Sequence, residues 1–220
     1  MTTIKPLLFQ GKVLNQNGQP INGATVQLWQ TDINGNYLHP NADVSSPLPQ
    51  HVSIVENFQY FGTDVSDDNG NFDFLTYKPG IYSARPYSHF HFAVYLTASE
   101  EPTLITQFYF KDESPPFPDA LELDVINVDA GTSYNYGSYM NGTIVLDDGA
   151  LPDEGNPLLQ TTPIQPGGPF YPVVDFFSFD NDLTTIEDDS MDEDDIRDKE
   201  MIPTSTPVGD ITELRGVGEA

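Results

Sequence analysis

The histidine pair His89 and His91 is the arrangement in this sequence with the clearest chemistry. The chain reads His89-Phe90-His91, and side chains two positions apart on a β-strand point to the same face. Both imidazoles would then face one point, which is the geometry that a metal ion needs. The same pattern also fits two hydrogen-bonded structural histidines, so the pair alone leaves both interpretations open.

Tyrosines are the remaining candidates for metal ligands. The chain has no cysteine, which excludes thiolate metal sites and cysteine nucleophiles. Tyr82 follows the Pro79-Gly80 break upstream of the histidines, and Tyr37 follows a turn with the sequence Asp-Ile-Asn-Gly. A phenol with a pKa of about 10 must lose its proton to bind a metal, and two phenolates with two imidazoles suit ferric iron better than zinc or magnesium. Spacing alone does not select these two from the eleven tyrosines.

Short strands separated by turns must position these side chains. The chain has 14 Phe and 11 Tyr with 19 Pro and 17 Gly, a mixture that favours many short strands over long helices. The turn Asp67–Gly70 predicts a hairpin that joins strands at Gly62–Val65 and Phe72–Leu75. Further strands or extended segments are expected at Leu7–Val13, Ala24–Trp29, Ile81–Ser83, His89–Leu96, Leu104–Phe110 and Thr143–Leu146. This pattern predicts an all-β sandwich or barrel.

The charge of the chain excludes several classes of partner. The 220 residues include 8 Lys and Arg against 34 Asp and Glu, a net charge of −26, so nucleic acid and anionic membranes are poor partners. No stretch approaches 18 apolar residues, and Met1–Val13 has no long apolar run, so we expect a cytoplasmic protein. From Asp180 to Glu200 there are eleven acidic residues against Arg197 and Lys199, which predicts a disordered acidic C-terminal tail.

Several stretches of the chain resemble the intradiol ring-cleavage dioxygenases, the family of catechol and protocatechuate dioxygenases. The similarity covers roughly residues 7–148. It is carried by the following stretches: Gly11-Lys12-Val13, Gly18–Ala24, Leu28–Asp32 with Gly35–His39, Thr63-Asp64 with Gly70–Phe74 and Lys78–Tyr82, Arg85-Pro86 with His89–Phe92, and Thr106–Phe110. The four candidate ligand residues occur in the same order along this chain as in the family, which makes the resemblance more specific than any single motif.

The sequence departs from the family pattern at three places. Pro86-Tyr87-Ser88 adds one residue between Arg85 and His89, and Lys111-Asp112-Glu113 replaces a Pro-Gly-Asp sequence. Residues 161–184 resemble the signature that precedes the first core strand in the family, but here they follow the last one. The order of segments therefore resembles a circular permutation, which exposed and neighbouring termini tolerate. The alternative is a turn-rich tail that matches the signature by chance.

The resemblance implies the architecture and the chemistry together. It implies an immunoglobulin- or prealbumin-like β-sandwich with long loops, with a dioxygenase core at 1–150 and a permuted segment packed on it at 151–185. The charge of the remaining chain predicts the acidic tail at 186–220. It implies a non-haem Fe(III) enzyme that cleaves a catechol-type diol with dioxygen to a muconate-type diacid. A homo-oligomer is left open.

The resemblance also assigns roles to individual residues. It implies metal ligation by Tyr37, Tyr82, His89 and His91. It makes Tyr82 and Arg85 catalytic residues, and it places Arg85, Gln107, Gly168, Pro169 and Phe170 at the substrate.

A non-catalytic interpretation stands beside the enzyme. Prealbumin-like and collagen-adhesin-type β-sandwich modules share the Gly-x-Val start, the Asp-x-x-Gly-x-Phe-x-Phe stretch and the Lys-Pro-Gly-x-Tyr stretch, and they serve as spacers or adhesion domains. Such modules have no need of Tyr37, His89 and His91 together, so this triple discriminates in favour of the enzyme.

Overall fold

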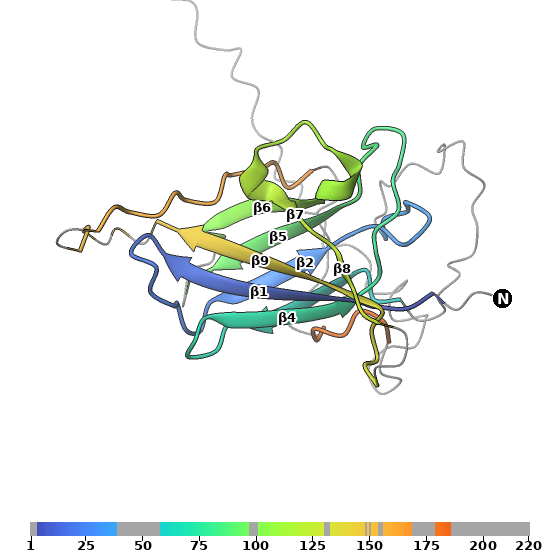
Figure 1. Ribbon diagram of the computed structural model, residues 1–220, viewed down its shortest axis with the longest axis horizontal. Coiled ribbons are helices and arrows are strands. Elements are labelled where there is room, and N and C mark those ends of the chain that lie inside the picture. The colour runs from blue at the N-terminus through green and yellow to red at the C-terminus, as the bar shows by residue number, and fades with distance from the viewer. Residues whose placement is uncertain are drawn as a thin grey trace, which may run out of the picture. The chain divides into compact units, whose positions relative to one another are not determined.

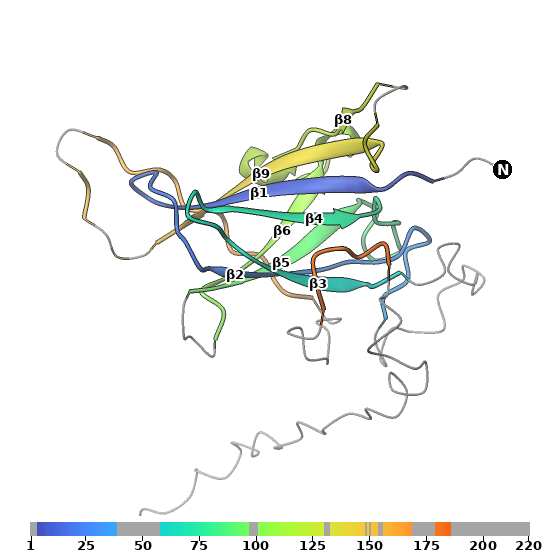
Figure 2. The ribbon, with the colours of Figure 1, turned by 90° about the horizontal axis from the view of Figure 1, so that it is seen from below.

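Two β-sheets packed face to face make up the computed structural model of this chain (Figures 1 and 2). The structure describes residues 4–38, 58–96, 101–129, 133–147, 149, 151–153, 156–168 and 179–185, and all of these belong to one compact unit, Met1–Ile186. The four-stranded sheet has the order β4-β1-β9-β8, and the five-stranded sheet has the order β3-β2-β5-β6-β7. The predicted all-β sandwich is confirmed, whereas the acidic tail at 186–220 lies outside the described residues.

The strands follow the expected order along the chain. They are β1 (Leu7–Asn15), β2 (Thr25–Trp29), β3 (Phe61–Val65), β4 (Asn71–Thr76), β5 (His89–Tyr95), β6 (Leu104–Phe110), β7 (Glu122–Leu123), β8 (Ile126–Asn127) and β9 (Ser138–Leu146). Two short 3-10 turns, η1 (Lys111–Glu113) and η2 (Asp119–Leu121), are the helical elements of the described chain. Within that part of the chain, no helix has the length and apolar character needed to cross a membrane.

The predicted hairpin between β3 and β4 is wrong. The turn itself forms, because the Asp67 carboxylate accepts hydrogen bonds from the backbone N–H groups of Asn69 and Asn71, both at 2.8 Å. The strands on either side nevertheless enter different sheets: β3 pairs with β2, and β4 pairs with β1. Gly70 accepts a hydrogen bond from the backbone N–H of Val13 in β1, at 2.8 Å, so the turn carries the chain from one layer to the other. The segment predicted at 81–83 forms only an isolated bridge between Tyr82 and Arg85.

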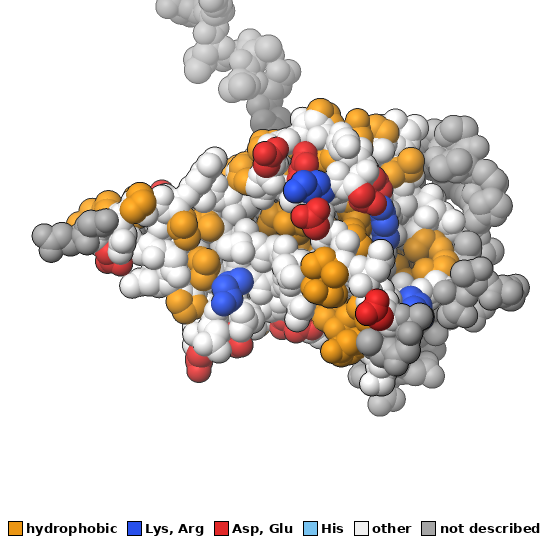
Figure 3. Space-filling model, in the orientation of Figure 1, with side chains coloured by type: hydrophobic (Ala, Val, Ile, Leu, Met, Phe, Trp, Pro, Cys, Tyr) orange, Lys and Arg blue, Asp and Glu red, His pale blue; other side chains and the backbone are white. Residues whose placement is uncertain are grey.

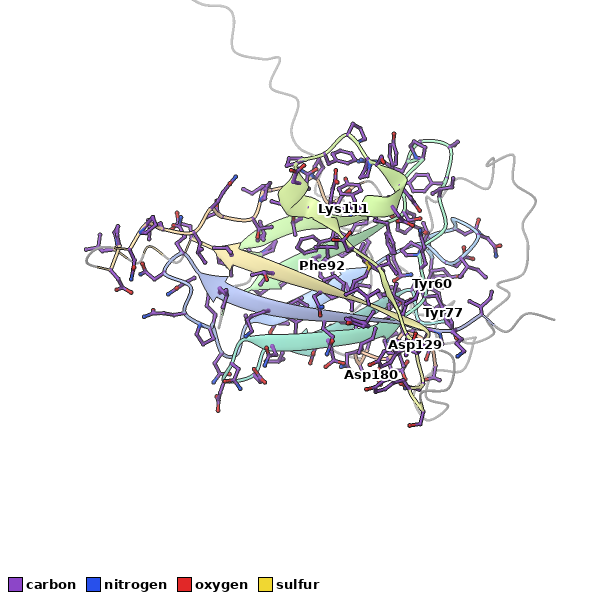
Figure 4. All side chains as sticks on the ribbon, viewed as in Figure 1. Tyr60, Tyr77, Phe92, Lys111, Asp129 and Asp180 are labelled. Atoms are coloured by element: carbon purple, nitrogen blue, oxygen red, sulfur yellow. The ribbon has the colours of Figure 1, made fainter. Side chains whose placement is uncertain are left out.

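Aromatic side chains fill the space between the two layers. The ring of Phe9 in β1 lies 4.9 Å from that of Phe92 in β5, measured between centroids, and Phe92 (labelled in Figure 4) is fully buried. Gly11 is required where β1 crosses this cluster, because a Cβ there would lie 2.0 Å from the ring of Phe72. Burying aromatic side chains of this size supplies most of the energy that holds such layers together.

The two sheets differ in how their outer faces are covered. In β1 and β9 buried positions alternate with more exposed ones along much of the strand, as expected for a sheet with one face toward solvent. In β5 and β6 nearly every residue is buried, so the outer face of the five-stranded sheet is covered as well. The loops after β2 and β4 and the later part of residues 156–168 provide this cover, and Figure 2 shows residues 156–168 running from beside the end of β9 to the side away from β1, β4 and β9.

Candidate metal centre

The two histidines of β5 lie on the covered outer face of the five-stranded sheet. Phe90 and Phe92 belong to the core between the sheets, so His89 and His91, which alternate with them, point the opposite way. Each histidine is only 3% exposed, and no histidine of the described chain is visible on the face drawn in Figure 3. Their Nε2 atoms are 3.1 Å apart.

The turn after β2 brings Tyr37 to the histidines. Its centre is the buried carboxylate of Asp32, which accepts hydrogen bonds from the backbone N–H groups of Asn34 at 2.8 Å and Asn36 at 2.9 Å. The hydroxyl oxygen of Tyr37 then lies 2.9 Å from His91 Nε2 and 3.4 Å from His89 Nε2. One phenol oxygen and two imidazole nitrogens therefore converge within 3.4 Å of one another.

Two glycines allow the loop that carries Tyr82 to approach the loop that carries Tyr37. Gly35 has a φ of +86°, and a Cβ there would lie 2.2 Å from the carbonyl oxygen of Ile81. A Cβ at Gly80 would lie 2.3 Å from the backbone nitrogen of Gly35. With the two backbones in contact, the rings of Tyr37 and Tyr82 meet edge to face at 5.7 Å, and their hydroxyl groups share a hydrogen bond.

Arg85 lies at the same centre. A tight turn joins it to Tyr82, with hydrogen bonds from Tyr82 N to Arg85 O at 3.1 Å and from Arg85 N to Tyr82 O at 2.9 Å. The guanidinium charge opposes the burial-induced rise in the pKa of both Tyr82 and Tyr109, which places it close to the two phenols. The extra residue between Arg85 and His89 in the sequence therefore does not remove Arg85 from the centre.

Burial keeps both imidazoles neutral at pH 7. It lowers the pKa of His89 to about 4, although the hydrogen bond to Tyr87 opposes the shift, and it lowers the pKa of His91 well below its usual value. The Nδ1 atom of His89 lies 2.8 Å from the carbonyl oxygen of Tyr87. Because a carbonyl only accepts, Nδ1 of His89 carries the proton and Nε2 presents a lone pair toward Tyr37 and His91. A neutral imidazole with a free lone pair is the form that binds metals.

Burial has the opposite consequence for the phenols. It raises the pKa of Tyr37 far above the ordinary value, and the neighbouring Tyr82 adds to the shift. The pKa of Tyr82 is also raised by burial, while Arg85 opposes the shift. A phenolate at this place needs a nearby cation to offset the loss of solvation.

The donor set fits a hard, strongly Lewis-acidic cation. The described residues contain no group of three or more His, Cys, Asp or Glu placed to hold a metal, so the candidate ligands are two imidazoles and two phenols. Neighbouring ligands on a metal with bonds of about 2.0–2.1 Å lie about 3 Å apart when they meet at right angles. The observed separations of 2.9, 3.1 and 3.4 Å match this spacing. Phenolate oxygen with imidazole nitrogen suits ferric iron.

Gln107 connects the centre to residues 156–168, which we call the strap. Gln107 lies opposite His91 in the ladder between β5 and β6. Its Nε2 donates to the carbonyl oxygen of Pro166 at 2.5 Å, and its Oε1 accepts from the hydroxyl of Tyr109 at 2.7 Å. Gly168 at the end of the strap approaches His91, since a Cβ there would lie 3.4 Å from His91 Cε1.

Further hydrogen bonds hold the strap against strands of both sheets, β9 and β6. Thr162 N donates to Val145 O and Gln165 N to Ile105 O, both at 2.9 Å, and Thr106 Oγ1 donates to Pro163 O at 2.8 Å. Pro169 and Phe170, which the resemblance places at the substrate, lie outside the described residues.

A second stretch from the same part of the chain closes one edge of the sandwich. Leu183 is fully buried, and its backbone N–H donates to Leu75 O in β4 at 2.8 Å. On the other side, Thr63 N in β3 donates to Asp180 O at 3.1 Å. Residues 180–183 therefore link the edge strands of the two sheets.

Three residues near the centre were missed by the sequence analysis. The indole of Trp29 stacks on His91, with centroids 4.9 Å apart and an interplanar angle of 13°. Tyr109 contacts Gln107 and Arg85, and burial raises its pKa to about 12. Glu113 binds the backbone N–H of Ser88 next to His89. Tyr109 could have been predicted from the sequence, because residues 107 and 109 of one strand share a face and Gln107 was already a candidate. No sequence pattern links Glu113 to the centre.

The comparisons with known proteins identify the family of the chain. A family model described as Dioxygenase matches residues 3–125. The chain is 32% identical over 111 residues to the protocatechuate 3,4-dioxygenase beta chain of Burkholderia cepacia, covering 47% of this chain and 44% of that protein. It is 33% identical over 73 residues to catechol 1,2-dioxygenase of Candida albicans, covering 33% of this chain and 21% of that protein. The matches therefore span less than half the length of either curated relative.

A solved structure shares the fold. A crystal structure of a mutant catechol 1,2 dioxygenase from Acinetobacter radioresistens superimposes with a TM-score of 0.50 and 20% sequence identity, covering 70% of this chain and 56% of that chain.

Proposed function

This chain belongs to the intradiol ring-cleavage dioxygenase family, and from that premise we propose that it cleaves a catechol-type aromatic diol with dioxygen to a muconate-type diacid. The observation that carries the proposal is the convergence of Tyr37 Oη, His89 Nε2 and His91 Nε2 within 3.4 Å, with Tyr82 hydrogen-bonded to Tyr37. A spacer or adhesion module has no use for two buried neutral imidazoles that face a pair of phenols.

The cofactor that this donor set fits is ferric iron, held by Tyr37, Tyr82, His89 and His91. When bound, ferric iron supplies Lewis acidity that draws electron density from the diol and a template that orients the reactants. The protein supplies two neutral imidazoles, a buried position that excludes water, and phenols whose deprotonation a trivalent cation makes favourable.

Tyr82 and Arg85 are the residues that we expect to act on the substrate. Both are half-buried rather than fully buried, so a ligand can reach them. A deprotonated Tyr82 would accept a proton from a substrate hydroxyl, because burial raises the pKa of its phenol and makes the phenolate a stronger base. The guanidinium of Arg85 remains charged at every working pH, and it would stabilise negative charge that develops on the diol.

The wall of the substrate site is proposed to include Gln107, Gly168, Pro169 and Phe170. Gln107 would act by holding its neighbours, because both ends of its amide are bonded to Tyr109 and Pro166. Gly168 would border the site directly, next to the edge of His91.

We also propose that residues 161–184 are the circularly permuted counterpart of the segment that opens the family's sequence. The support is that both described parts of this stretch pack on the sandwich, one on the outer face of the five-stranded sheet and one at its edge. The proposed division is a core at 1–150, the packed segment at 151–185 and the acidic tail at 186–220. A cytoplasmic location and the oligomeric state stay predictions from the sequence.

Turnover of catechol under air tests the proposed reaction. The iron-loaded protein should consume one dioxygen for each catechol and yield a diacid heavier than catechol by two oxygen atoms. The matched His91→Ala protein, loaded in the same way, should yield none. A ring-cleavage product that carries an aldehyde would refute intradiol chemistry, and a loaded wild-type protein without any turnover would favour the non-catalytic module.

A further inference from the structure

The carboxylate of Glu113 joins the two ends of the loop that carries Tyr82 and Arg85. This loop runs from Lys78, after β4, to Ser88, before β5, and we call it the 78–88 loop. Glu113 lies in η1, directly after β6. Its Oε1 is 2.8 Å from Lys78 Nζ, and its Oε2 accepts a hydrogen bond from the backbone N–H of Ser88 at 2.6 Å.

The surroundings strengthen the bond from Glu113 to Ser88 more than the ion pair with Lys78, whose side chain is 42% exposed. Ser88 is 3% exposed, and Lys78 Nζ lies 4.5 Å from the ring centroid of Phe110. The side chain of Glu113 is 23% exposed, whereas that of the neighbouring Asp112, which lies 3.6 Å from the same lysine, is 63% exposed. Partial burial reduces screening by water and salt, so the charge-assisted bonds of Glu113 are the stronger ones.

The loop between these two ends lies outside the strand ladders. β4 ends at Thr76 and β5 begins at His89, and within the loop Tyr82 and Arg85 bond to each other's backbone. Gly80 N donates to Asp32 O at 2.8 Å, which fixes the start of the loop against the turn before Tyr37. At the far end, Ser88 N donates to Glu113 and Tyr87 O accepts from His89 Nδ1, so Glu113 supplies the contact from outside the loop and β5.

We propose that Glu113 is a positioning residue that closes the base of the 78–88 loop and thereby sets where Tyr82 and Arg85 stand relative to the histidines. The proposal rests on the proposed function for the meaning of those positions, but the closure of the loop is a property of the chain itself. One carboxylate reaches both segments that must be in place, because Lys78 leads into Tyr82 and Ser88 leads into His89.

Four substitutions separate this role from a general loss of stability. Glu113→Ala removes both contacts, whereas Glu113→Gln keeps an acceptor for Ser88 N–H and removes the charge that faces Lys78. Asp112→Asn is the matched control for charge, because it removes the adjacent, more exposed carboxylate. Val13→Ala is the control for stability, because Val13 is a fully buried residue of β1.

Hydrogen exchange of the metal-free proteins is the first measurement, since it needs neither iron nor activity. Loss of a hydrogen bond to a charged group predicts that exchange across residues 82–88 rises about tenfold or more in Glu113→Ala. The rise should be smaller in Glu113→Gln, and Asp112→Asn should stay within about twofold of wild type. Val13→Ala should not raise exchange selectively in this loop. Should Glu113→Ala fail to fold, Glu113→Gln decides, and its exchange at 82–88 should exceed that of Asp112→Asn; equal exchange in the two would overturn the role.

Visible absorption of the iron-loaded proteins is the second measurement. The tyrosinate-to-iron band should shift in Glu113→Ala and remain in place in Asp112→Asn and Val13→Ala, because only the first displaces Tyr82. Unchanged exchange at 82–88 in Glu113→Ala, or an equal rise in Asp112→Asn, would overturn the positioning role. A wild-type protein that takes up no iron would instead overturn the proposed function and would leave the exchange result to decide the role of Glu113.

Discussion

Substitution of Gly168 by alanine probes the boundary between the strap and the metal centre. Gly168 has a φ of +77°, and a Cβ there would lie 3.4 Å from His91 Cε1. Gly23 has a φ of +75°, but a Cβ there would meet no atom within 4 Å. An alanine in the left-handed region costs about 1–2 kcal/mol, so both substitutions should lower the free energy of unfolding by a similar amount.

The two variants should differ in substrate binding. In Gly168→Ala the added methyl group stands beside His91, where we place the wall of the substrate site. One methyl group of misfit in a pocket is worth about 1–3 kcal/mol, so the KM for catechol should rise about tenfold while iron content stays unchanged. Gly23→Ala should keep the wild-type KM. Denaturant unfolding and steady-state kinetics measure the two effects separately, and an equal KM in the two variants would show that Gly168 does not border the substrate.

Three further predictions concern the ligands, the pH dependence and the strap. His91→Ala should abolish iron binding while Tyr87→Ala retains it, as elemental analysis would show; the reverse pattern would mean that the ligand register is wrong. The pKa of His89 falls from 6.5 in the unfolded chain to about 4 in the folded protein. Between these pH values the unfolded chain binds more protons than the folded protein. The free energy of unfolding of the metal-free protein should therefore fall by up to about 3 kcal/mol as the pH is lowered from 6.5 to 4. His89→Asn should show a smaller loss in denaturant titrations at the two pH values, and an identical loss would contradict the shift. A chain ending after Thr185 should keep stability and catechol cleavage, whereas a chain ending after Thr161 should lose one or both. Full stability and activity of the shorter chain would show that residues 162–185 are dispensable.

The strands could be predicted from the sequence because their signals are local. The alternation of Phe90 and Phe92 with His89 and His91 fixes which face of β5 meets the core, and the structure follows it. The pairing of strands could not be predicted in the same way. The turn at Asp67–Gly70 was correct in itself, but whether it closes a hairpin depends on which strand β4 finds as its neighbour.

The same holds for the metal centre: contacts within one strand could be predicted from the sequence, and contacts between distant segments could not. The resemblance selected Tyr37 and Tyr82, whereas the spacing of residues did not, because two loops meet there through the backbones of Gly35 and Gly80. Glu113 is 25 positions from Ser88 along the chain, and the sequence around either residue contains no pattern that predicts their contact. Both residues belong to segments where the sequence departs from the family pattern, so the motifs that identify the family carried no information about them.

Iron bound to the purified protein tests the central claim most directly. Protein prepared in iron-replete medium should contain close to one iron per chain and show a broad visible band from tyrosinate-to-iron charge transfer. The band should weaken or shift in Tyr37→Phe and Tyr82→Phe, and it should be unaffected in Tyr134→Phe, because Tyr134 is an exposed residue (59%). A colourless wild-type protein that takes up no ferric iron, or a band that survives both ligand substitutions unchanged, would contradict the account.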